Sequence, residues 1–345
     1  MLIFGIETSC DETACAVVKD GTEVVGAFLA TSAETHLKTG GVVPEVAARK
    51  QVESIIPVIE ECFKASSLSV KNLDALTVTV GPGLIGSLIV GVETAKALAA
   101  FYALPLVPVN HLVGHIYGNF VGRKPSEIEF PCVVLIVSGG HTDLVLMKGH
   151  GVFDYIGGTL DDACGEAFDK VARILGLAPY FGGPHVSKAA SSFLGKASFR
   201  FKRPMSDSGN FNFSFSGIKT AVVNKVLAFR KENALDAAAS LPPDFVSEVA
   251  FEFQEAVTDV LVLKTLKALK QYSVGTLLIA GGVAANATLR KKFEEASATE
   301  SFKFFVPPLD LCSDNAIYIA SCAEFNFKPS PLNTIFANPS LTVVS

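Results

Sequence analysis

The strongest constraint on how this chain can fold is a plan of strands and turns that occurs twice. Near the N-terminus, three apolar strands are joined by short polar turns, and from residue 132 three more strands follow the same plan. After each triplet, helical and strand patterns alternate. This order predicts mixed sheets covered by helices, and its repetition predicts a duplicated α/β fold with two lobes and a cleft between them. The six strands are expected at residues 2–6, 14–18, 23–28, 132–137, 144–147 and 152–156.

The repeat also predicts how the chain divides into domains. We expect a first lobe at residues 1–110, with a C-terminal helix of about residues 313–345 packing back onto it, and a second lobe at residues 111–312. Residues 191–244 break the alternating plan, so we interpret them as an insertion in the second lobe with at least one helix. The remaining helices and strands are expected at residues 44–66, 75–80, 88–102, 106–109, 160–175, 276–280, 284–295, 302–306 and 313–325.

Composition and charge narrow the class of protein. The net charge of −5 provides no global basic field that would attract a nucleic acid by itself. The seven cysteines include no Cys-x-x-Cys pair, which favours a reducing compartment over a disulfide framework. No leader is visible before the first apolar strand. The uncharged run at residues 75–92 contains Gly81-Pro82-Gly83, which splits it into a strand, a turn and a helix start. We therefore expect a cytoplasmic protein with no membrane span.

Two histidines, His111 and His115, indicate a metal site. A spacing of four places both imidazoles on one face of a helix, one turn apart. Imidazole is a ligand of zinc, iron and nickel. The pattern is close to the His-Glu-x-x-His of zinc proteases, but Leu112 stands where those enzymes have their general base, which argues against a peptidase. By themselves, the two residues can also be unrelated histidines on a polar helix face.

Turns rich in glycine and hydroxyl groups follow strands in both halves and indicate a nucleotide site. They lie at residues 7–13, 138–142 and 281–286, where backbone N–H groups and small side chains let a polyanion approach closely. Asn286 stands at the start of the helix after the third turn, where a ribose or base would lie. Any one such turn can be merely a tight connection. Three at corresponding strand ends are the layout of the actin, Hsp70 and sugar-kinase ATPases, whose lobes have a ribonuclease H-like fold.

As an ordered set, these motifs resemble the TsaD family of tRNA N6-adenosine threonylcarbamoyltransferases, also called the Kae/Gcp/YgjD family, in its bacterial-like branch. The resemblance covers nearly the whole chain. Gln51 departs from it, because a His is common at that position in the family. The matching segments are residues 6–13, 41–45, 81–83, 111–115, 137–142, 161–170, 213–217, 280–286 and 312–315.

The resemblance implies transfer of a threonylcarbamoyl group from threonylcarbamoyl-AMP to N6 of adenosine 37 in tRNAs that read codons beginning with A, which forms t6A. It implies one divalent metal ion, Fe²⁺ in preference to Zn²⁺, held by His111, His115 and Asp314 with open positions for substrate oxygens. Threonylcarbamoyl-AMP or ATP is the implied nucleotide. The positions that match its binding residues are Ile136, Val137, Ser138, Gly139, Gly140, Asp169, Gly183 and Asn286.

Asp11 and Glu12 are the candidate catalytic residues. A carboxylate beside the reacting amine can take its proton or orient it, and we favour Asp11 over Glu12 in this role. An Asp in a turn can also serve only to bond local N–H groups. Ser9 and Ser138 supply turn hydroxyls, which we expect to bond phosphate or metal-bound water.

The resemblance also implies partners. These are tRNA, a TsaB-like paralogue that forms a heterodimer, a TsaE-like ATPase, and a TsaC/Sua-type synthase that supplies threonylcarbamoyl-AMP. We predict that the helix at residues 45–60 docks the paralogue, with core packing as the alternative for its apolar face. A small-molecule kinase of the same fold would not explain the three metal ligands together, and intact ligands argue against a non-catalytic adenylate-binding subunit. The apolar face runs through Val46, Val52, Ile55, Ile56 and Ile59.

Overall fold

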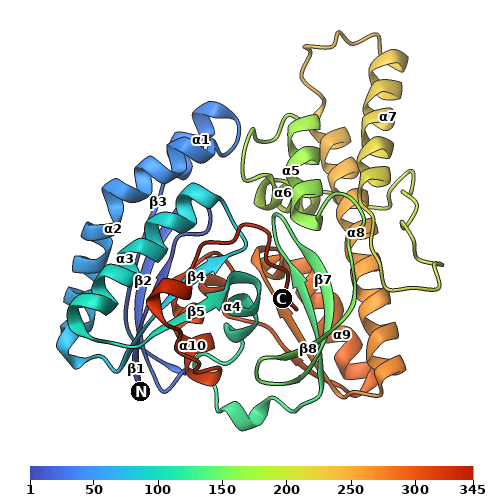
Figure 1. Ribbon diagram of the computed structural model, residues 1–345. Helices are drawn as coiled ribbons and strands as arrows, with labels where there is room; N and C mark the ends of the chain where they lie inside the picture. The colour runs from blue at the N-terminus through green and yellow to red at the C-terminus, as the bar shows by residue number, and fades with distance from the viewer. Residues whose placement is uncertain (345) are drawn as a thin grey trace.

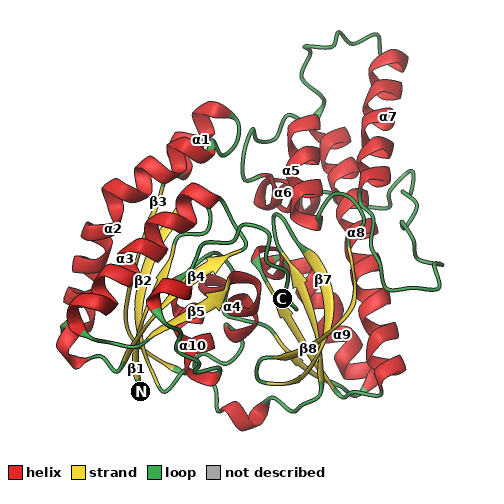
Figure 2. Ribbon diagram, viewed as in Figure 1, coloured by secondary structure: helices red, strands yellow, loops and turns green. Residues whose placement is uncertain are grey.

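The computed structural model describes residues 1–344, and every side chain among them except those of residues 38 and 39. Figure 1 shows two sheets lying side by side, each with helices packed against it. In Figure 2, the strands of both sheets lie toward the centre of the molecule and most helices lie outside them. The chain completes all five strands of the first sheet before it enters the second.

The first sheet begins with an antiparallel hairpin and continues with parallel strands. It has the order β3-β2-β1-β4-β5, in which β1 is antiparallel to β2 and parallel to β4. Alternate residues of β1 point to opposite faces, so that Phe4 and Ile3 belong to different core clusters. Both faces of this sheet are therefore buried. Its strands are β1 (Leu2–Glu7), β2 (Glu12–Lys19), β3 (Glu23–Thr31), β4 (Ala75–Gly81) and β5 (Leu106–Asn110).

Helices α2 and α3 pack on one face of the first sheet, and α10 packs on the other. By length and composition alone, α3 is the one helix among residues 1–344 that is long and apolar enough to cross a membrane. Its Val92, Ala95 and Ala99 are buried in the core beside α2. The uncharged run at 75–92 is thus β4, a turn and the start of α3, as predicted. The helices are α1 (Ala33–Thr39), α2 (Pro44–Ser66), α3 (Ile85–Tyr102) and α10 (Ala316–Phe325).

The second sheet repeats the plan of the first. Read from one edge, its order is β8-β7-β6-β9-β10, and β6 is antiparallel to β7 and parallel to β9. These are the same neighbours and directions as in the first sheet, so the predicted duplicated α/β fold is confirmed. Its strands are β6 (Cys132–Val137), β7 (Thr142–Gly149), β8 (Val152–Gly158), β9 (Thr276–Ala280) and β10 (Lys303–Phe305).

A long helix in the second lobe was not expected from the sequence. α8 buries Phe253, Val257 and Leu261 in the largest core cluster. Its buried residues are spread around the helix rather than along one stripe, so the helical period is weak in the sequence. α7 lies within residues 191–244 and stands out from the sheets in Figure 2. The helices of this half are α4 (His111–Tyr117), α5 (Cys164–Ile174), α6 (Gly182–Ser191), α7 (Ser216–Glu232), α8 (Pro243–Tyr272) and α9 (Ala287–Glu300).

The two sheets share a layer made of α4 and α10, which lie between them in Figure 1. One core cluster contains Leu112 of α4 and Ile319 of α10. The same cluster contains Val109 of the first sheet and Val134 of the second. The predicted lobe boundary near residue 111 falls at the start of α4 and stays a prediction, as does the insertion.

The closing helix predicted at residues 313–325 is confirmed as α10, whereas the C-terminal helix of the domain assignment, about residues 313–345, is too long. α10 begins at Ala316 and ends at Phe325, and it does not extend toward residue 345, because Pro329 and Pro331 cannot continue a helix. The following segment instead runs along the first sheet. There the backbone N–H of Ser330 donates to a β5 carbonyl, and the N–H of Asn338 donates to a β4 carbonyl.

Candidate functional site

The predicted histidine pair lies on α4, directly after β5. Asn110 ends the strand, and its side chain accepts hydrogen bonds from the backbone N–H groups of Leu112 and Val113, which starts the helix. His111 and His115 then stand one turn apart on the same helix. Both side chains are buried in the layer between the sheets.

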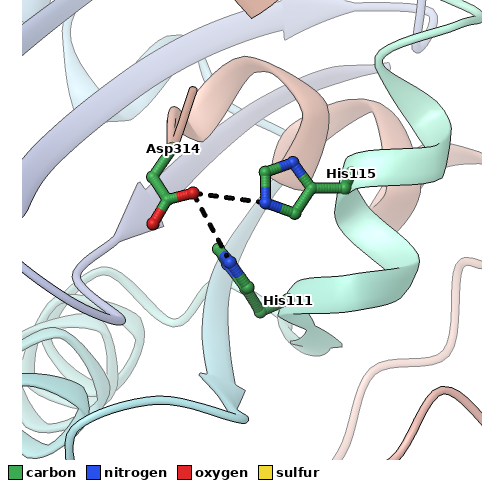
Figure 3. Close-up of side chains that lie close together, drawn as sticks. All are labelled: His111, His115 and Asp314. Atoms are coloured by element: carbon green, nitrogen blue, oxygen red, sulfur yellow. Dashed lines mark ion pairs between the residues drawn. The ribbon is translucent and has the colours of Figure 1, made fainter. Parts of the chain in front are cut away.

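Asp314 reaches these histidines from the loop before α10. Its neighbour Asn315 fixes the loop by accepting hydrogen bonds from two N–H groups at the start of α10. Oδ1 of Asp314 lies 3.2 Å from Nε2 of His115 and 3.5 Å from Nε2 of His111. Figure 3 shows both rings pointing toward this oxygen, and the three ligand atoms lie within 4.8 Å of one another. The fold therefore brings Asp314 to a histidine pair that lies about 200 residues earlier in the sequence.

Glu7, which sequence reasoning missed, supports this cluster from the end of β1. It is fully buried, and its Oε2 lies 3.1 Å from Nδ1 of His111. The same carboxylate accepts hydrogen bonds from the Thr79 hydroxyl and the Ser9 N–H. Histidines that bind metals commonly donate their second nitrogen to a carboxylate in this way. The available signal was a charged residue at the end of an otherwise apolar strand.

The chemistry of these groups fits a bound cation. A carboxylate only accepts hydrogen bonds, so Nδ1 of His111 carries a hydrogen and the Nε2 of the neutral ring presents a lone pair toward Asp314. Two acceptors that face each other need a cation or a proton between them. Nδ1 of His115 is buried and has no hydrogen-bond partner among residues 1–344. Two nitrogens and one carboxylate oxygen are a donor set for Fe²⁺ or Zn²⁺.

The electrostatics of the cluster match this interpretation. Burial lowers the pKa of His111, but the charges of Asp314 and Glu7 outweigh burial and raise it to about 9. Burial and the charge of His111 lower the pKa of His115. Burial also lowers the pKa of the neighbouring His141 to about 4, and the charges of His111 and His115 contribute to that shift. The acidic environment thus favours one positive charge at the cluster, which a metal ion can supply.

The candidate acids lie in the turn between β1 and β2. The Asp11 carboxylate is almost fully buried, and its Oδ2 accepts a hydrogen bond of 2.9 Å from the hydroxyl of Tyr180. Burial raises the pKa of Glu12 well above its usual range, and the charges of Asp314 and Asp11 add to the effect. Tyr180 follows α5 in the second lobe and was not identified from the sequence. The structure therefore gives Asp11 and Glu12 different surroundings.

Ser9 lies beside the histidines. Its hydroxyl is 3.2 Å from Nδ1 of His111, so the side chain touches the histidine cluster directly. The Ser138 hydroxyl instead accepts a hydrogen bond from the N–H of His141 and shapes its own turn. The expected contacts of both hydroxyls with phosphate or metal-bound water stay predictions.

The predicted glycine turns of the second lobe lie together. Ile136 and Val137 are fully buried at the end of β6, and the turn of Ser138, Gly139 and Gly140 follows them. A Cβ on Gly281, whose φ is +91°, would collide with the Val137 carbonyl oxygen. The 281–282 turn can therefore approach the end of β6 only because it begins with glycine.

Two of the other predicted nucleotide-binding residues accept hydrogen bonds from the N-terminal turns of helices. Oδ1 of Asp169 accepts a hydrogen bond of 2.7 Å from the N–H of Gly182, at the first turn of α6. Gly183 follows in that turn, and the space around its Cα is open. Asn286 caps α9 through its oxygen, and its amide donates to Ser187 and Gln254. A structural role is thus visible for Asp169 and Asn286, and their nucleotide contacts stay predictions.

Comparison with known proteins decides the family. The family model described as TsaD, tRNA N6-adenosine threonylcarbamoyltransferase, matches residues 23–321. The chain belongs to the TsaD family. A relative from Bacillus subtilis (strain 168) with the name tRNA N6-adenosine threonylcarbamoyltransferase is 48% identical over 329 residues, which are 95% of this chain and 91% of the relative. A relative of the same name from Bacillus cereus is 46% identical over 99% of this chain and 96% of its own length.

Solved structures agree on the fold of this TsaD-family chain. HypF from T. kodakarensis has a TM-score of 0.61 at 14% identity, over 94% of this chain and 47% of that protein. A full-length HypF in a phosphate- and nucleotide-bound form has a TM-score of 0.60 at 12% identity, over 95% of this chain and 47% of that protein. These are actin-like ATPase folds, and the likeness supports the architecture alone.

Proposed function

We propose that this chain transfers a threonylcarbamoyl group from threonylcarbamoyl-AMP to N6 of adenosine 37 in tRNAs that read codons beginning with A. Membership of the TsaD family supports the reaction. The observation that carries the proposal in this chain is the convergence of His111, His115 and Asp314 beside the buried acids Asp11 and Glu12. The enzyme is therefore an acyltransferase that modifies tRNA.

His111, His115 and Asp314 would hold one divalent ion. The three side chains leave coordination positions open, as in two-histidine, one-carboxylate iron sites, so we favour Fe²⁺ over Zn²⁺. When bound, such an ion acts as a Lewis acid toward carbonyl and phosphate oxygens. Glu7 keeps the hydrogen of His111 on Nδ1, which leaves Nε2 free to coordinate.

Asp11 is our preferred proton acceptor. The amine nitrogen N6 attacks the carbamoyl carbon, the bond from that carbon to the phosphate oxygen breaks, and AMP leaves with the electron pair. Asp11 takes the proton that N6 loses, and Tyr180 keeps the carboxylate in place through its hydroxyl. Glu12 is the second candidate for the base, and burial and the charges of Asp314 and Asp11 raise its pKa.

The adenylate would lie along the glycine turns of the second lobe. Gly139 and Gly140 are exposed, and no described atom comes within 4 Å of a Cβ built on either of them, so a phosphate can approach their backbone. Gly282 is exposed in the adjacent turn. ATP would fit the same turns. Asp169, which accepts a hydrogen bond from the first turn of α6, would complete the adenylate site together with Gly183 of that turn and Asn286, which caps α9.

The paralogue would dock on α2. Ile55 and Ile59 are buried in the first core, so this half of the predicted apolar face belongs to the interior. Val52 and Ile56 are exposed on the same helix and are the better candidates for contact with a TsaB-like partner. We further propose a TsaE-like ATPase, a TsaC/Sua-type synthase and a cytoplasmic location, with tRNA as the substrate.

Nucleoside analysis tests the function. Purified protein is incubated with tRNA, ATP, threonine, bicarbonate and the companion proteins, and the digested tRNA is analysed for t6A. We expect t6A with the wild type and none with Asp314→Asn. Transfer of phosphate to a small molecule without any t6A would favour a kinase. Adenylate binding without either product would favour a regulatory subunit.

A further inference from the structure

The turn that contains the candidate catalytic acids is shaped by other elements rather than by its own hydrogen bonds. Between residues 8 and 12, each backbone carbonyl accepts a hydrogen bond from another part of the chain. Ser9 accepts from the N–H of Leu84, and Asp11 accepts from the N–H and the hydroxyl of Ser32. The remaining three carbonyls all accept from one side chain.

That side chain is Gln51 of α2, which is 1% exposed. Its Nε2 lies 3.3 Å from the Thr8 carbonyl oxygen, 3.0 Å from that of Cys10 and 3.0 Å from that of Glu12. An amide nitrogen has only two hydrogens, so three acceptors require at least one shared hydrogen bond. All three neighbours are carbonyls, which only accept, and this fixes which end of the amide faces the turn. Three backbone carbonyl groups of the turn thus point to one nitrogen atom.

We propose that Gln51 is a positioning residue for this active site. It touches no substrate, and it sets the path of the backbone that carries Ser9, Asp11 and Glu12. Its other end supports this assignment, because Oε1 is buried without a hydrogen-bond partner among residues 1–344. A buried acceptor without a partner is unfavourable, so contacts elsewhere must hold the amide in place. The inference rests on the proposed function, in which Asp11 receives the proton.

Three variants distinguish a positioning role of Gln51 from an effect on the stability of the folded protein alone. Gln51→Met keeps the volume and removes the donor, whereas Gln51→His keeps an N–H that can reach a carbonyl. Val58→Ala is the matched control, because Val58 is buried in the core of the first sheet on the same helix, about two turns beyond Gln51. Each variant is assayed for t6A with the complete set of companion proteins, and amide exchange of residues 9–12 is measured on the protein alone.

We expect Gln51→Met to lower kcat roughly ten- to hundredfold with KM for tRNA unchanged within about twofold, since a small misplacement of a catalytic group has effects of this size. Amide exchange in the turn should be faster, and Gln51→His should recover part of both losses. Val58→Ala should lower the melting temperature but not kcat.

Wild-type kcat and exchange in Gln51→Met would overturn the inference. An equal fall of kcat in Val58→Ala, or a Gln51→His protein no better than Gln51→Met, would also overturn it. If the wild type makes no t6A, the proposed function fails, and the exchange rates alone then decide whether Gln51 holds the turn.

Discussion

Replacement of Glu7 by Gln tests how the first lobe prepares His111 for a metal ion. The carboxylate accepts the Ser9 N–H at 2.5 Å with Oε1 and the Thr79 hydroxyl at 2.5 Å with Oε2, and Oε2 also lies 3.1 Å from Nδ1 of His111. The Ser9 N–H can only donate, so the carbonyl oxygen of the new amide must face it. The NH₂ group must then face Thr79 and His111.

This orientation changes the tautomer of His111. Nδ1 now has to accept, so the hydrogen moves to Nε2, the nitrogen that faces Asp314. A protonated nitrogen has no lone pair for a metal. Changes of this kind behind a ligand weaken metal binding by about 10- to 100-fold, which corresponds to about 1.4–2.7 kcal/mol. The metal-free fold should lose less than about 1 kcal/mol, because every polar group of the amide still finds a partner.

The assay is a competition titration of metal-free protein with Zn²⁺ against a chelating indicator, together with ¹⁵N NMR of the imidazoles to identify the tautomer. Glu252→Gln is the control, since Glu252 is also buried but belongs to α8, in the second lobe. It should bind Zn²⁺ like the wild type. The reasoning is wrong if Glu7→Gln keeps wild-type affinity, or if its His111 still carries the hydrogen on Nδ1.

Three further predictions address the rest of the molecule. His115→Ala or Asp314→Asn should each remove the bound metal and the transfer activity but leave the circular dichroism spectrum unchanged, and metal analysis that finds the ion still bound would contradict this. Tyr180→Phe should lower kcat about tenfold without changing adenylate affinity, because it removes a hydrogen bond to the charged Asp11. The control variant Tyr155→Phe removes a similar hydrogen bond to Asp143 and should leave kcat unchanged. Asp161 accepts four hydrogen bonds at the start of α7, and although burial raises its pKa, these donors lower it to about 2. Its contribution to stability is therefore complete above its usual pKa of 3.8 and is lost as the pH falls through about 2. Amide protection factors at the start of α7, which correct for the intrinsic pH dependence of exchange, should therefore be lower at pH 2 than at pH 5, with no such difference in Asp161→Ala.

The parts of the fold that were predicted correctly rest on local patterns. The span of α2, residues 44–66, was predicted to the residue, because Pro44 begins it and an amphipathic period runs through it. The two similar sheets were also predicted from a local pattern, the triplet of strands that occurs twice in the sequence. α8 was not predicted, because its apolar residues face several directions. The closing helix was predicted at residues 313–325, close to the observed α10, whereas its extension to residue 345 in the domain assignment is excluded by Pro329 and Pro331.

The contacts that organise the site could not be read from spacing. Glu7, Gln51 and Tyr180 act on residues 104, 39 to 43 and 169 positions away in the chain. The pairing of strands in the first sheet brings Glu7 to His111, and the packing of α2 brings Gln51 to the turn. The contact between the two lobes brings Tyr180 to Asp11. Sequence motifs locate reactive groups, whereas the hydrogen bonds that orient them depend on how distant strands and helices pack.

The site joins two groups of residues, and each group connects the two lobes. His111, His115 and Asp314 belong to α4 and the start of α10, which share a core cluster with strands of both sheets. The bond between Tyr180 and Asp11 instead connects the second lobe directly to the β1–β2 turn. The predicted boundary at residue 111 assigns both histidines to the second lobe and Asp314 to the first, so a rotation of one lobe against the other would stretch that bond and would also move Asp314 relative to the histidines. Metal affinity and the orientation of the proton acceptor should therefore both depend on how the two lobes meet.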